Sequence, residues 1–408
     1  MLEYNKQKYS PRELNILSIL HTIIDNQEAS STEIIDTTGL SNATVSRVLN
    51  TLKTRNIIVS KGKEITNLGR RPEKVSINCQ YGYIAHFNIN EDVIVGFLSD
   101  LNGTVLATEQ RAVDGKITVE MLKEKISDAF YSLEEVKRQN KEVLALSFSV
   151  PCAVSSDSRT INRTVDVFSF TELDFSDLIE DMLKIPVVVN NIAMLMALGQ
   201  YKSINSDVDS MVFVCFSRAI GIGCGIVIDG ELFKGHSNYA GEIGYMLYST
   251  DNFDRVQKKN IGSLEEKAGL RAIYVNVMAK VLDGGALVLK KMLDSGEKLD
   301  ILLIEKAIML GDLDCKEILD EALKIWSIAL INIYLTINPK VIVIGGAISA
   351  QNSYILKQLS DIFANTLLIR PNIMLSTLTY DEAQLIGGVS ILKEYVFDNI
   401  VGKKALEE

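Results

Sequence analysis

Beyond about residue 80, apolar segments with the composition of β-strands alternate with long amphipathic stretches that are typical of helices. The strand-like segments are YIAHFNI, VIVGFLSDLNGTVLATEQRAV, VLALSFSV, PVVVN, MVFVCF and VIVIGGAIS. Helical patterns separate them, and the clearest cover residues 117–138 and 316–336. Because alternating strands and long helices pack as sheets covered by helices, this pattern predicts an α/β fold and not a β-sandwich.

The same order of strands and helix occurs twice along this region, which predicts two related halves. Four glycines are expected at hairpin turns, because glycine adopts the positive φ that such turns require. They are Gly96, Gly103, Gly230 and Gly235. No low-complexity linker precedes this region, so we expect a short boundary at residues 75–82 and an N-terminal part that lies close to the body.

Length and composition predict a soluble protein with more than one domain. The chain has 408 residues, enough for two or three domains, with 47% hydrophobic and 23% charged residues. No apolar run approaches the roughly 18 residues of a membrane span, and the N-terminus lacks an apolar signal core. The five cysteines are scattered and never paired as C-x-x-C, which favours a reducing cytoplasm and argues against a cysteine-based zinc site.

Charge is unevenly distributed along the chain. The net charge is −10, yet residues 41–74 hold eight basic and two acidic residues, a local excess of +6. A basic island on an acidic chain is typical of a surface that binds nucleic acid. Charge alone leaves open a second interpretation, in which the island is only a solvated face.

The sequence around the island favours the first interpretation. Ser10 with Glu13, and Ser30 with Glu33, have the spacing of capping boxes at the starts of two helices. The second helix is expected to end at Gly39. After one intervening residue, Ser41 is expected to cap a third helix. Short helices joined by a tight glycine-containing turn predict a helix-turn-helix, with an ordinary helical hairpin as the alternative.

The third helix is the expected recognition helix. Its core-facing stripe is predicted to be Val45, Val48, Leu49 and Leu52. The polar residues at its start are short or forked side chains that suit base edges and phosphates in a major groove. The residues predicted to contact DNA there are Ser41, Asn42, Thr44, Ser46 and Arg47.

A wing is expected after this helix. The segment IIVSKGKEITNLGRRPEKVSIN reads as two short strands around a loop that contains lysine and glycine. In GRRP, glycine and proline flank Arg70 and Arg71 and favour an extended segment that can enter a narrow minor groove. Both arginines are therefore predicted to contact DNA.

Several motifs in order along nearly the whole chain carry a family resemblance. They are TGLSNATVSRVLNTL, GRRP, SVPCAV, PVVVNNIAMLMALGQ, GIGCGIVIDGELFKGHSNYAGEIGYM, GSLEEKAG and NPKVIVIGGAIS. The chain resembles the ROK family of bacterial sugar kinases and sugar-responsive repressors, in the architecture of the repressors.

The resemblance implies a specific domain organisation. It implies a winged helix-turn-helix over residues 1–78 and, over 79–408, a body of two lobes with the actin-like, ribonuclease-H-like fold of ATPases. The first lobe would cover about 79–190 plus the C-terminal helix, and the second about 191–380. A sugar would bind in the cleft between the lobes.

The parts that make family members kinases are missing here. The family's first phosphate loop has glycines after an aspartate, whereas this chain has HFNINEDVIVGF, in which Glu91 and Asp92 would repel phosphates. The family's catalytic base is the aspartate of an Asn-Asp pair, whereas Asn191 is followed here by Ile192. A positioned base contributes about 10²- to 10⁴-fold in rate. We therefore expect no catalytic residue and no kinase activity.

The glycine-rich segment after residue 218 has also diverged. The family's second phosphate loop reads Gly-Thr-Gly-Ile-Gly, and the chain has Ala219 to Gly223 without the threonine. Tyr245 replaces the histidine that in the family binds sugar and zinc, and Ser263 stands where the last zinc cysteine would be. We expect no metal and no cofactor, and a turn in place of a phosphate cradle.

What survives of the sugar site predicts an effector-binding cleft. The candidate residues are Asn191, Glu242, Tyr245 and Glu265, because carboxylates, amides and a tyrosine are usual partners of hydroxyls. Asp166 falls near a loop that closes over the sugar, and Arg218 is placed for an anionic group or an ion pair. In the alternative, Asn191 only caps a helix and Glu242 only braces a turn.

The sequence thus predicts a cytoplasmic DNA-binding regulator, a repressor of sugar-utilisation genes controlled by a sugar or sugar derivative. Its expected partners are double-stranded operator DNA, the effector, and copies of itself in a homodimer or homotetramer, with no membrane. An active ROK-type ATP-dependent sugar kinase with an added DNA-binding domain is the alternative. A third interpretation is a regulator whose cleft is vestigial.

Overall fold

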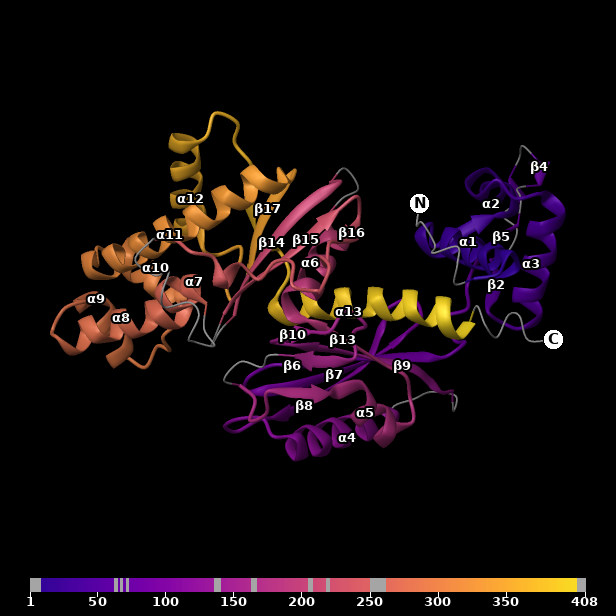
Figure 1. Cartoon of the computed structure of the whole chain (residues 1–408), viewed down its shortest axis with the longest axis horizontal. Coiled ribbons are helices and arrows are strands. Elements are labelled where there is room, and N and C mark those ends of the chain that lie inside the picture. Colours follow the sequence, from indigo (N-terminus) through magenta and orange to yellow (C-terminus); the bar gives the residue numbers. More distant parts are fainter. Residues whose placement is uncertain are drawn as a thin grey trace.

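The structure is a computed structural model of the chain. It describes residues 9–61, 65–66, 69–70, 73–135, 141–162, 167–204, 208–217, 221–249 and 262–401. Three parts are visible in Figure 1: a small N-terminal part, and two larger ones that each contain a sheet.

The N-terminal part has the order of elements of a winged helix. Its elements are α1 (Pro11–Asp25), β1 (Glu28–Ser30), α2 (Ser31–Thr38), α3 (Asn42–Thr54), β2 (Ile58–Lys61), β3 (Ile65–Thr66), β4 (Gly69–Arg70) and β5 (Lys74–Ile77). Strands β1, β5 and β2 form an antiparallel sheet, and β3 pairs with β4. The capping boxes at Ser10 and Ser30 and the cap at Ser41 are all present, and Gly39 ends α2 with φ +68°. The expected helix starts are confirmed.

The first lobe is built on a five-stranded mixed sheet in the order β13-β9-β6-β7-β8. Its strands are β6 (Tyr83–Ile89), β7 (Val93–Asp100), β8 (Val105–Ala112), β9 (Val143–Val150) and β13 (Val187–Asn191), with helices α4 (Val119–Glu135) and α5 (Phe175–Leu183). Strand β6 pairs antiparallel with β7 and parallel with β9. A small sheet of β10 (Ala153–Val154), β11 (Thr160–Asn162) and β12 (Glu172–Asp174) adjoins it.

The second lobe repeats this plan with the order β16-β15-β14-β17-β18. Its strands are β14 (Ser210–Phe216), β15 (Ile222–Ile228), β16 (Glu231–Leu232), β17 (Val341–Gly346) and β18 (Asn372–Leu375). Its helices are α7 (Ser263–Ala268), α8 (Leu270–Leu282), α9 (Leu287–Asp294), α10 (Ile301–Met309), α11 (Leu313–Ile337) and α12 (Ser353–Thr366), with a 3₁₀ turn η1 (Ile243–Tyr245). The two halves expected from the repeated pattern are therefore present.

Two helices run between the sheets. Helix α13 (Tyr380–Val396) lies across the centre of the molecule beside α6 (Ile192–Ser203), as Figure 1 shows. Their backbones approach closely at glycines: a Cβ on Gly199 would lie 2.0 Å from the carbonyl oxygen of Ala383, and one on Gly387 would lie 2.0 Å from that of Leu195. Glycine is required at these positions because any side chain would separate the helices.

Two glycines were placed wrongly from the sequence. Gly96 lies inside β7, opposite Phe87 on β6, and not in a turn. A Cβ there would lie 2.7 Å from the Phe87 ring, so packing explains this glycine. Gly235 has φ +69° and lies after β16, in a segment that leads to η1 and not to a paired strand. Gly103 and Gly230, with φ +92° and +84°, do lie in hairpin turns.

The N-terminal part packs against the end of the C-terminal helix. Buried side chains of α1 and α3 share one apolar core with Val389, Leu392 and Val396 of α13 and with Phe397 and Val401 beyond it. The Nε2 atom of His21 on α1 lies 2.9 Å from Oδ1 of Asp398. The expected closeness of the N-terminal part to the body is confirmed, although the C-terminus, which the sequence did not point to, provides much of the contact.

Candidate functional site

The start of helix α3 presents an exposed polar surface. Ser41, Asn42, Ser46 and Arg47 are exposed and Thr44 is half-buried, while the predicted stripe Val45, Val48, Leu49 and Leu52 is buried. The Ser41 hydroxyl accepts from the Thr44 N–H at 3.2 Å, and the Ser46 hydroxyl donates to Asn42 Oδ1 at 3.2 Å. The cap therefore holds the five predicted DNA contacts on the outward face of the helix.

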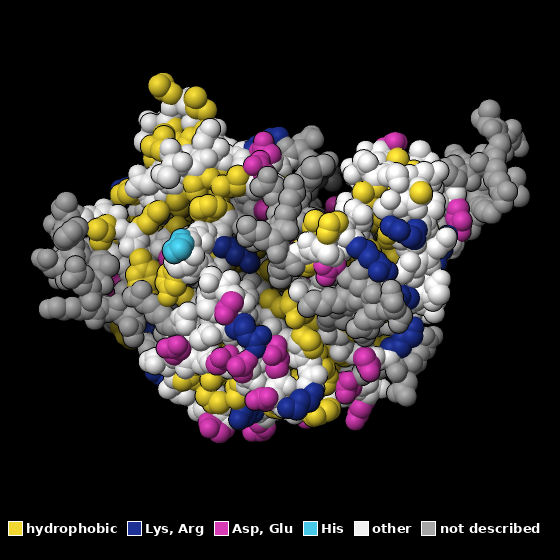
Figure 2. Space-filling view, turned by 45° about the vertical axis from the view of Figure 1, so that its right-hand side comes forward, with side chains coloured by type: hydrophobic (Ala, Val, Ile, Leu, Met, Phe, Trp, Pro, Cys, Tyr) yellow, Lys and Arg dark blue, Asp and Glu magenta, His cyan; other side chains and the backbone are white. Residues whose placement is uncertain are grey.

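Basic residues lie around this face, and Figure 2 shows Lys and Arg side chains gathered on the right-hand part of the molecule. Lys53 pairs with Glu73 at 3.2 Å, and Lys74 pairs with Glu28 at 2.9 Å. The hydrogen bond from Lys74 lowers the pKa of Glu28. Exposed pairs of this kind contribute only about 0–1 kcal/mol, so these lysines can exchange carboxylates for DNA phosphates at little cost. Arg47 forms no ion pair with any described residue.

The predicted minor-groove arm is only partly described. The backbone of Gly69 and Arg70 forms β4, paired with β3. The side chain of Arg70 and the whole of Arg71 lie outside the described residues. Their contact with DNA stays a prediction.

Asn191 stands at the end of β13, where the first sheet meets α6. Its Oδ1 accepts from the Ala193 N–H at 2.8 Å and so caps α6, and its Nδ2 donates to the Cys152 carbonyl at 3.0 Å. The capping role that the sequence left as an alternative is therefore real. Within the described residues, these two bonds leave one acceptor lone pair and one donor hydrogen of the half-buried side chain with which to meet a ligand.

Glu265 on α7 holds two backbone segments. Its Oε1 accepts from the Ile222 N–H at 2.9 Å, and its Oε2 from the Gly262 N–H at 3.1 Å. Gly244 lies directly against this carboxylate, since a Cβ there would come within 2.3 Å of Oε1. An internal carboxylate thus occupies a backbone N–H of the glycine-rich turn that would otherwise be free to meet an external anion.

Glu242 directly precedes the 3₁₀ turn η1 and Tyr245 is its last residue, and both are half-buried. The charge of Glu242 acts together with burial, which is the larger cause, to raise the pKa of Cys152. Glu242 and Asn191 therefore share a neighbour in Cys152, while Glu265 lies under the turn that carries Tyr245. The four predicted effector residues come together from β13, η1 and α7.

At the same edge of the first sheet as Asn191, where β6 also ends, polar contacts join separate elements. The Ser217 hydroxyl, after β14, donates to Glu91 Oε1 at 2.7 Å and joins the two lobes. Asn88 and Asn90 donate to Asp381 Oδ1 at 3.0 and 3.3 Å. Two carboxylates therefore lie at this edge, where the sequence predicts repulsion of phosphates.

The predicted catalytic position carries no ionisable group. Ile192 is the first residue of α6, is 5% exposed, and packs in an apolar cluster with Ala193, Met196 and Phe213. Ser263 is likewise buried at the start of α7. Asp166 and Arg218 lie outside the described residues.

The histidines and cysteines form no metal cluster within the described residues. Burial raises the pKa of Cys215 and of Cys224 to about 12, so both thiols are protonated at neutral pH. His86 is fully buried between Ser147 and Asn88, and burial lowers its pKa to about 4. It is a neutral core residue.

One residue near the predicted effector site was missed from the sequence. Asn238, between β16 and η1, is buried and donates from Nδ2 to the carbonyls of Val154 at 2.9 Å and Ser155 at 3.3 Å. Its place four residues before Glu242 could have singled it out, but nothing in its local pattern predicts contact with the first lobe.

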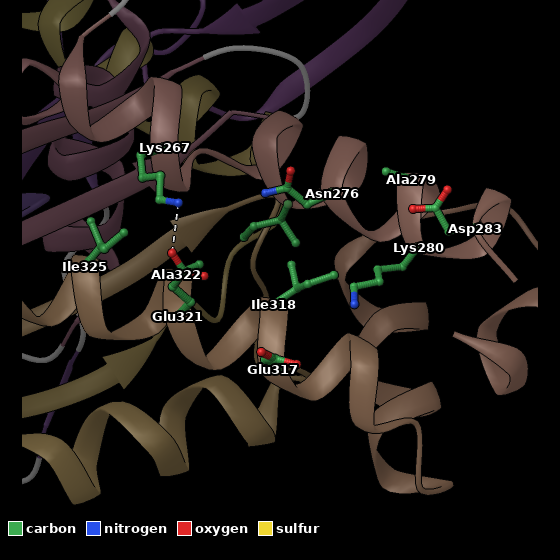
Figure 3. Close-up of a pocket in the computed structure, with 11 residues that line it drawn as sticks. Lys267, Asn276, Ala279, Lys280, Asp283, Glu317, Ile318, Glu321, Ala322 and Ile325 are labelled. Carbon is green, nitrogen blue, oxygen red and sulfur yellow. Dashed lines mark ion pairs between the residues drawn. The ribbon is translucent and has the colours of Figure 1, made fainter. Parts of the chain in front are cut away.

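A surface pocket of about 280 Å³ lies between α8 and α11, and Figure 3 shows its lining. Lys267 pairs there with Glu321 at 2.8 Å, while Lys280 and Glu317 lie further along the groove. Its lining includes none of the predicted effector residues. No single described helix is long and apolar enough to span a membrane, although the bent pair Ser263–Leu282 and Leu287–Asp294 meets that test by length and composition.

Comparison with known proteins decides the family. Residues 88–394 match the model of the ROK family. The chain belongs to the ROK family. Residues 14–61 also match the IclR helix-turn-helix domain, which covers α1 to β2. This ROK protein therefore carries a DNA-binding module ahead of its body, as in the family's transcriptional regulators.

Relatives of this ROK protein include regulators. The chain is 27% identical to a xylose repressor of Caldicellulosiruptor bescii over 86% of this chain and 87% of the relative. It is 24% identical to the DNA-binding transcriptional dual regulator NagC of Escherichia coli over 97% and 96%. The likeness to NagC, at 97% of the chain, extends across the winged helix and the body.

Solved structures establish the fold of this ROK protein. A ROK family transcriptional regulator that is a homologue of the Escherichia coli Mlc protein matches with a TM-score of 0.78 and 20% identity, over 97% of this chain and 99% of that one. A ROK family glucokinase from Streptomyces griseus, in complex with glucose and AMPPNP, matches with a TM-score of 0.62 and 20% identity, over 76% and 99%. The expected fold, a winged helix-turn-helix followed by an actin-like body, is confirmed.

Proposed function

We propose that this ROK protein is a cytoplasmic repressor of sugar-utilisation genes that binds operator DNA and is released by a sugar. The observation that carries the proposal is the exposed polar start of α3 on a winged helix joined to a ROK body. Residues 1–78 would form the DNA-binding domain and 79–408 the effector-binding body. The lobes would divide at about residue 190, with 191–380 in the second lobe and the C-terminal helix in the first.

In this proposal the DNA contacts come from two places. Ser41, Asn42, Thr44, Ser46 and Arg47 meet the major groove, and Arg70 and Arg71 the adjacent minor groove. Two copies of the chain, in a homodimer or a homotetramer, place two α3 helices on a near-palindromic operator.

The effector is a sugar or sugar derivative held by Asn191, Glu242, Tyr245 and Glu265. Several relatives are xylose repressors, so D-xylose is the first compound to test. The sugar acts by binding one arrangement of the lobes more tightly than the other, because a ligand with equal affinity for both would shift nothing.

Phosphoryl transfer is not part of the proposed function. Ile192 cannot take a proton from a sugar hydroxyl, and the N–H of Ile222 in the glycine turn already donates to Glu265. Glu91, bonded to Ser217 beside this turn, and Asp381 at the end of β6 add negative charge. A coupled assay with ATP and a panel of hexoses and pentoses should give no sugar-dependent ADP release, and turnover would favour the kinase alternative.

Fluorescence anisotropy tests the proposal most directly. Purified protein is titrated onto DNA from upstream of its own gene at about physiological salt, where non-specific binding is weak, with Kd of about 10⁻⁴–10⁻⁶ M. Each titration is repeated with D-xylose, D-glucose and N-acetyl-D-glucosamine. Tight binding that one sugar releases supports the proposal. Binding no tighter than to unrelated DNA contradicts it, and tight binding that no sugar changes contradicts its effector part.

A further inference from the structure

Asn238 joins the two lobes next to the predicted effector residues. It lies in the second lobe, between β16 and η1, and its carboxamide reaches β10 of the first lobe. Nδ2 donates to the Val154 carbonyl at 2.9 Å and to the Ser155 carbonyl at 3.3 Å. Both donor hydrogens of the amide are therefore used across the lobes, since two carbonyls can only face the amino end of the group.

The acceptor end of the same carboxamide has no partner in the part of the chain that the structure describes. The side chain is 4% exposed, and Oδ1 is buried without a hydrogen-bond donor among the described residues. A buried carbonyl oxygen without a donor destabilises the protein that holds it. The backbone of Asn238 also adopts φ +61°, a conformation that disfavours most side chains but that asparagine tolerates. Packing within the protein alone explains neither the buried oxygen without a donor nor the positive φ of Asn238.

Its surroundings are those of the predicted effector site. The segment Cys152–Ser155 is held from one side by Nδ2 of Asn191, at 3.0 Å from the Cys152 carbonyl, and from the other by Asn238. Glu242 follows Asn238 by four residues and lies close enough to affect the Cys152 thiol. An asparagine from the end of the first sheet and one from the second lobe thus converge on the same four residues.

We propose that Asn238 is an effector-binding residue that also closes the lobes: Oδ1 accepts a hydrogen bond from a hydroxyl of the bound sugar while Nδ2 holds Val154 and Ser155. This proposal rests on the proposed function and deepens it. Because the carboxamide can meet all three partners only when the lobes are together, the sugar favours the closed arrangement. The ligand class is a neutral polyol, since the orphan oxygen requires a donor and gains nothing from an anion.

The test compares Asn238→Gly with wild type. Glycine keeps the positive φ without strain and removes the carboxamide alone. Asn338→Gly is the matched control, because Asn338 also has positive φ, +50°, but caps the end of α11 in the second lobe. Two quantities are measured on the full chain: the concentration of D-xylose, D-glucose or N-acetyl-D-glucosamine that half-releases operator DNA, and operator affinity without sugar.

The expected result is a rise of at least tenfold in the half-releasing sugar concentration for Asn238→Gly, with operator affinity unchanged and with Asn338→Gly like wild type. Asn238→Asp, which keeps the size of the side chain but cannot donate to both carbonyls, should raise that concentration too. If Asn238→Gly responds to sugar as wild type does, the role of Asn238 is refuted while the proposed function stands, even where its Tm falls. If wild type responds to none of the sugars, the effector part of the proposed function fails, and this inference with it.

Discussion

The start of helix α3 and the predicted effector site both carry polar residues that the proposed function needs, yet the two regions use them in different ways. On α3, Asn42, Ser46 and Arg47 are exposed, and among the described residues their side chains bond only to their own helix or to nothing. In the predicted effector site, Asn191 and Glu265 already hold backbone N–H groups of the protein. The first region is an exposed surface that can bind DNA without breaking bonds within the protein. The second region, which we call the joint, is the set of side chains that connect backbone segments around the predicted effector site. A ligand can act there by favouring one arrangement of these connections.

This comparison predicts two kinds of mutant. A substitution of an exposed polar side chain on α3 should weaken DNA binding and leave the free energy of unfolding unchanged, because the fold does not depend on that side chain. A substitution in the joint should first lower the free energy of unfolding. It should change the binding of sugar and DNA only indirectly, through the arrangement of the lobes.

Arg47→Ala should have the largest effect on function. A good bidentate base contact is worth about 1–3 kcal/mol, so operator affinity should fall by about 10- to 100-fold toward the non-specific level, while Tm stays the same. Fluorescence anisotropy on operator DNA measures the loss. Arg271→Ala, at an exposed arginine of α8, is the control. Unchanged operator affinity would mean that α3 is not the recognition helix.

Acid should weaken the fold through His86. Burial lowers the pKa of His86 to about 4, whereas the unfolded chain takes up this proton near pH 6.5. The contribution of neutral His86 is complete above pH 6.5 and is lost as pH falls toward 4, by about 3 kcal/mol in the free energy of unfolding. Urea unfolding between pH 7 and pH 4.5 measures this slope. His86→Gln should flatten it, and an equal slope in that variant would assign the acid sensitivity to other groups.

Glu265→Ala should destabilise the second lobe. It leaves the N–H groups of Ile222 and Gly262 without their acceptor, at a cost of about 1–3 kcal/mol in the free energy of unfolding. Glu266→Ala, at the exposed neighbour, is the control. Equal midpoints of urea unfolding for the two variants would show that Glu265 is not part of the joint. Substitutions in the two regions would then not differ in their effect on stability.

His21 should produce a smaller pH dependence of opposite sign. Burial alone would lower its pKa, but the hydrogen bond to Asp398 and the charges of Asp398, Glu394 and Asp25 raise it above 6.5. The stability from this pair is therefore fully present below pH 6.5 and is lost as pH rises through the folded pKa. His21→Gln should reduce the fall in unfolding free energy between pH 6 and pH 8. A slope as steep as that of wild type would contradict the assignment.

Local features were predictable from the sequence, and contacts between distant segments were not. The caps at Ser10, Ser30 and Ser41 depend on three or four neighbouring residues, and the strands at 83–89 and 143–150 on unbroken apolar runs. Gly96 was misplaced because its reason is Phe87 on the adjacent strand. The short strands β10–β12 and β18 carry too few residues to form a pattern.

The candidate site was predictable in composition but not in bonding. A family resemblance placed Asn191, Glu242, Tyr245 and Glu265 in one region, but whether they bind an effector stays a prediction. That Glu265 holds the glycine turn depends on α7 packing beside β15, which no periodicity indicates. Asn238 went unnoticed for the same reason, because its partners lie about 80 residues earlier in the other lobe.

Helix α13 is a rigid connection between the lobes and the winged helix, so a rotation at one end displaces the other. Its first turn, at Asp381, accepts hydrogen bonds from Asn88 and Asn90 at the end of β6, and its far end continues into the core of the winged helix. Its 17 residues span about 25 Å at 1.5 Å per residue. A tilt of about 10° at the α6 contact would therefore carry the far end roughly 4 Å sideways. That displacement is more than half of the roughly 6 Å width of a minor groove, so in the proposed function a small closing movement of the lobes around the sugar would be enough to move α3 out of register with its operator.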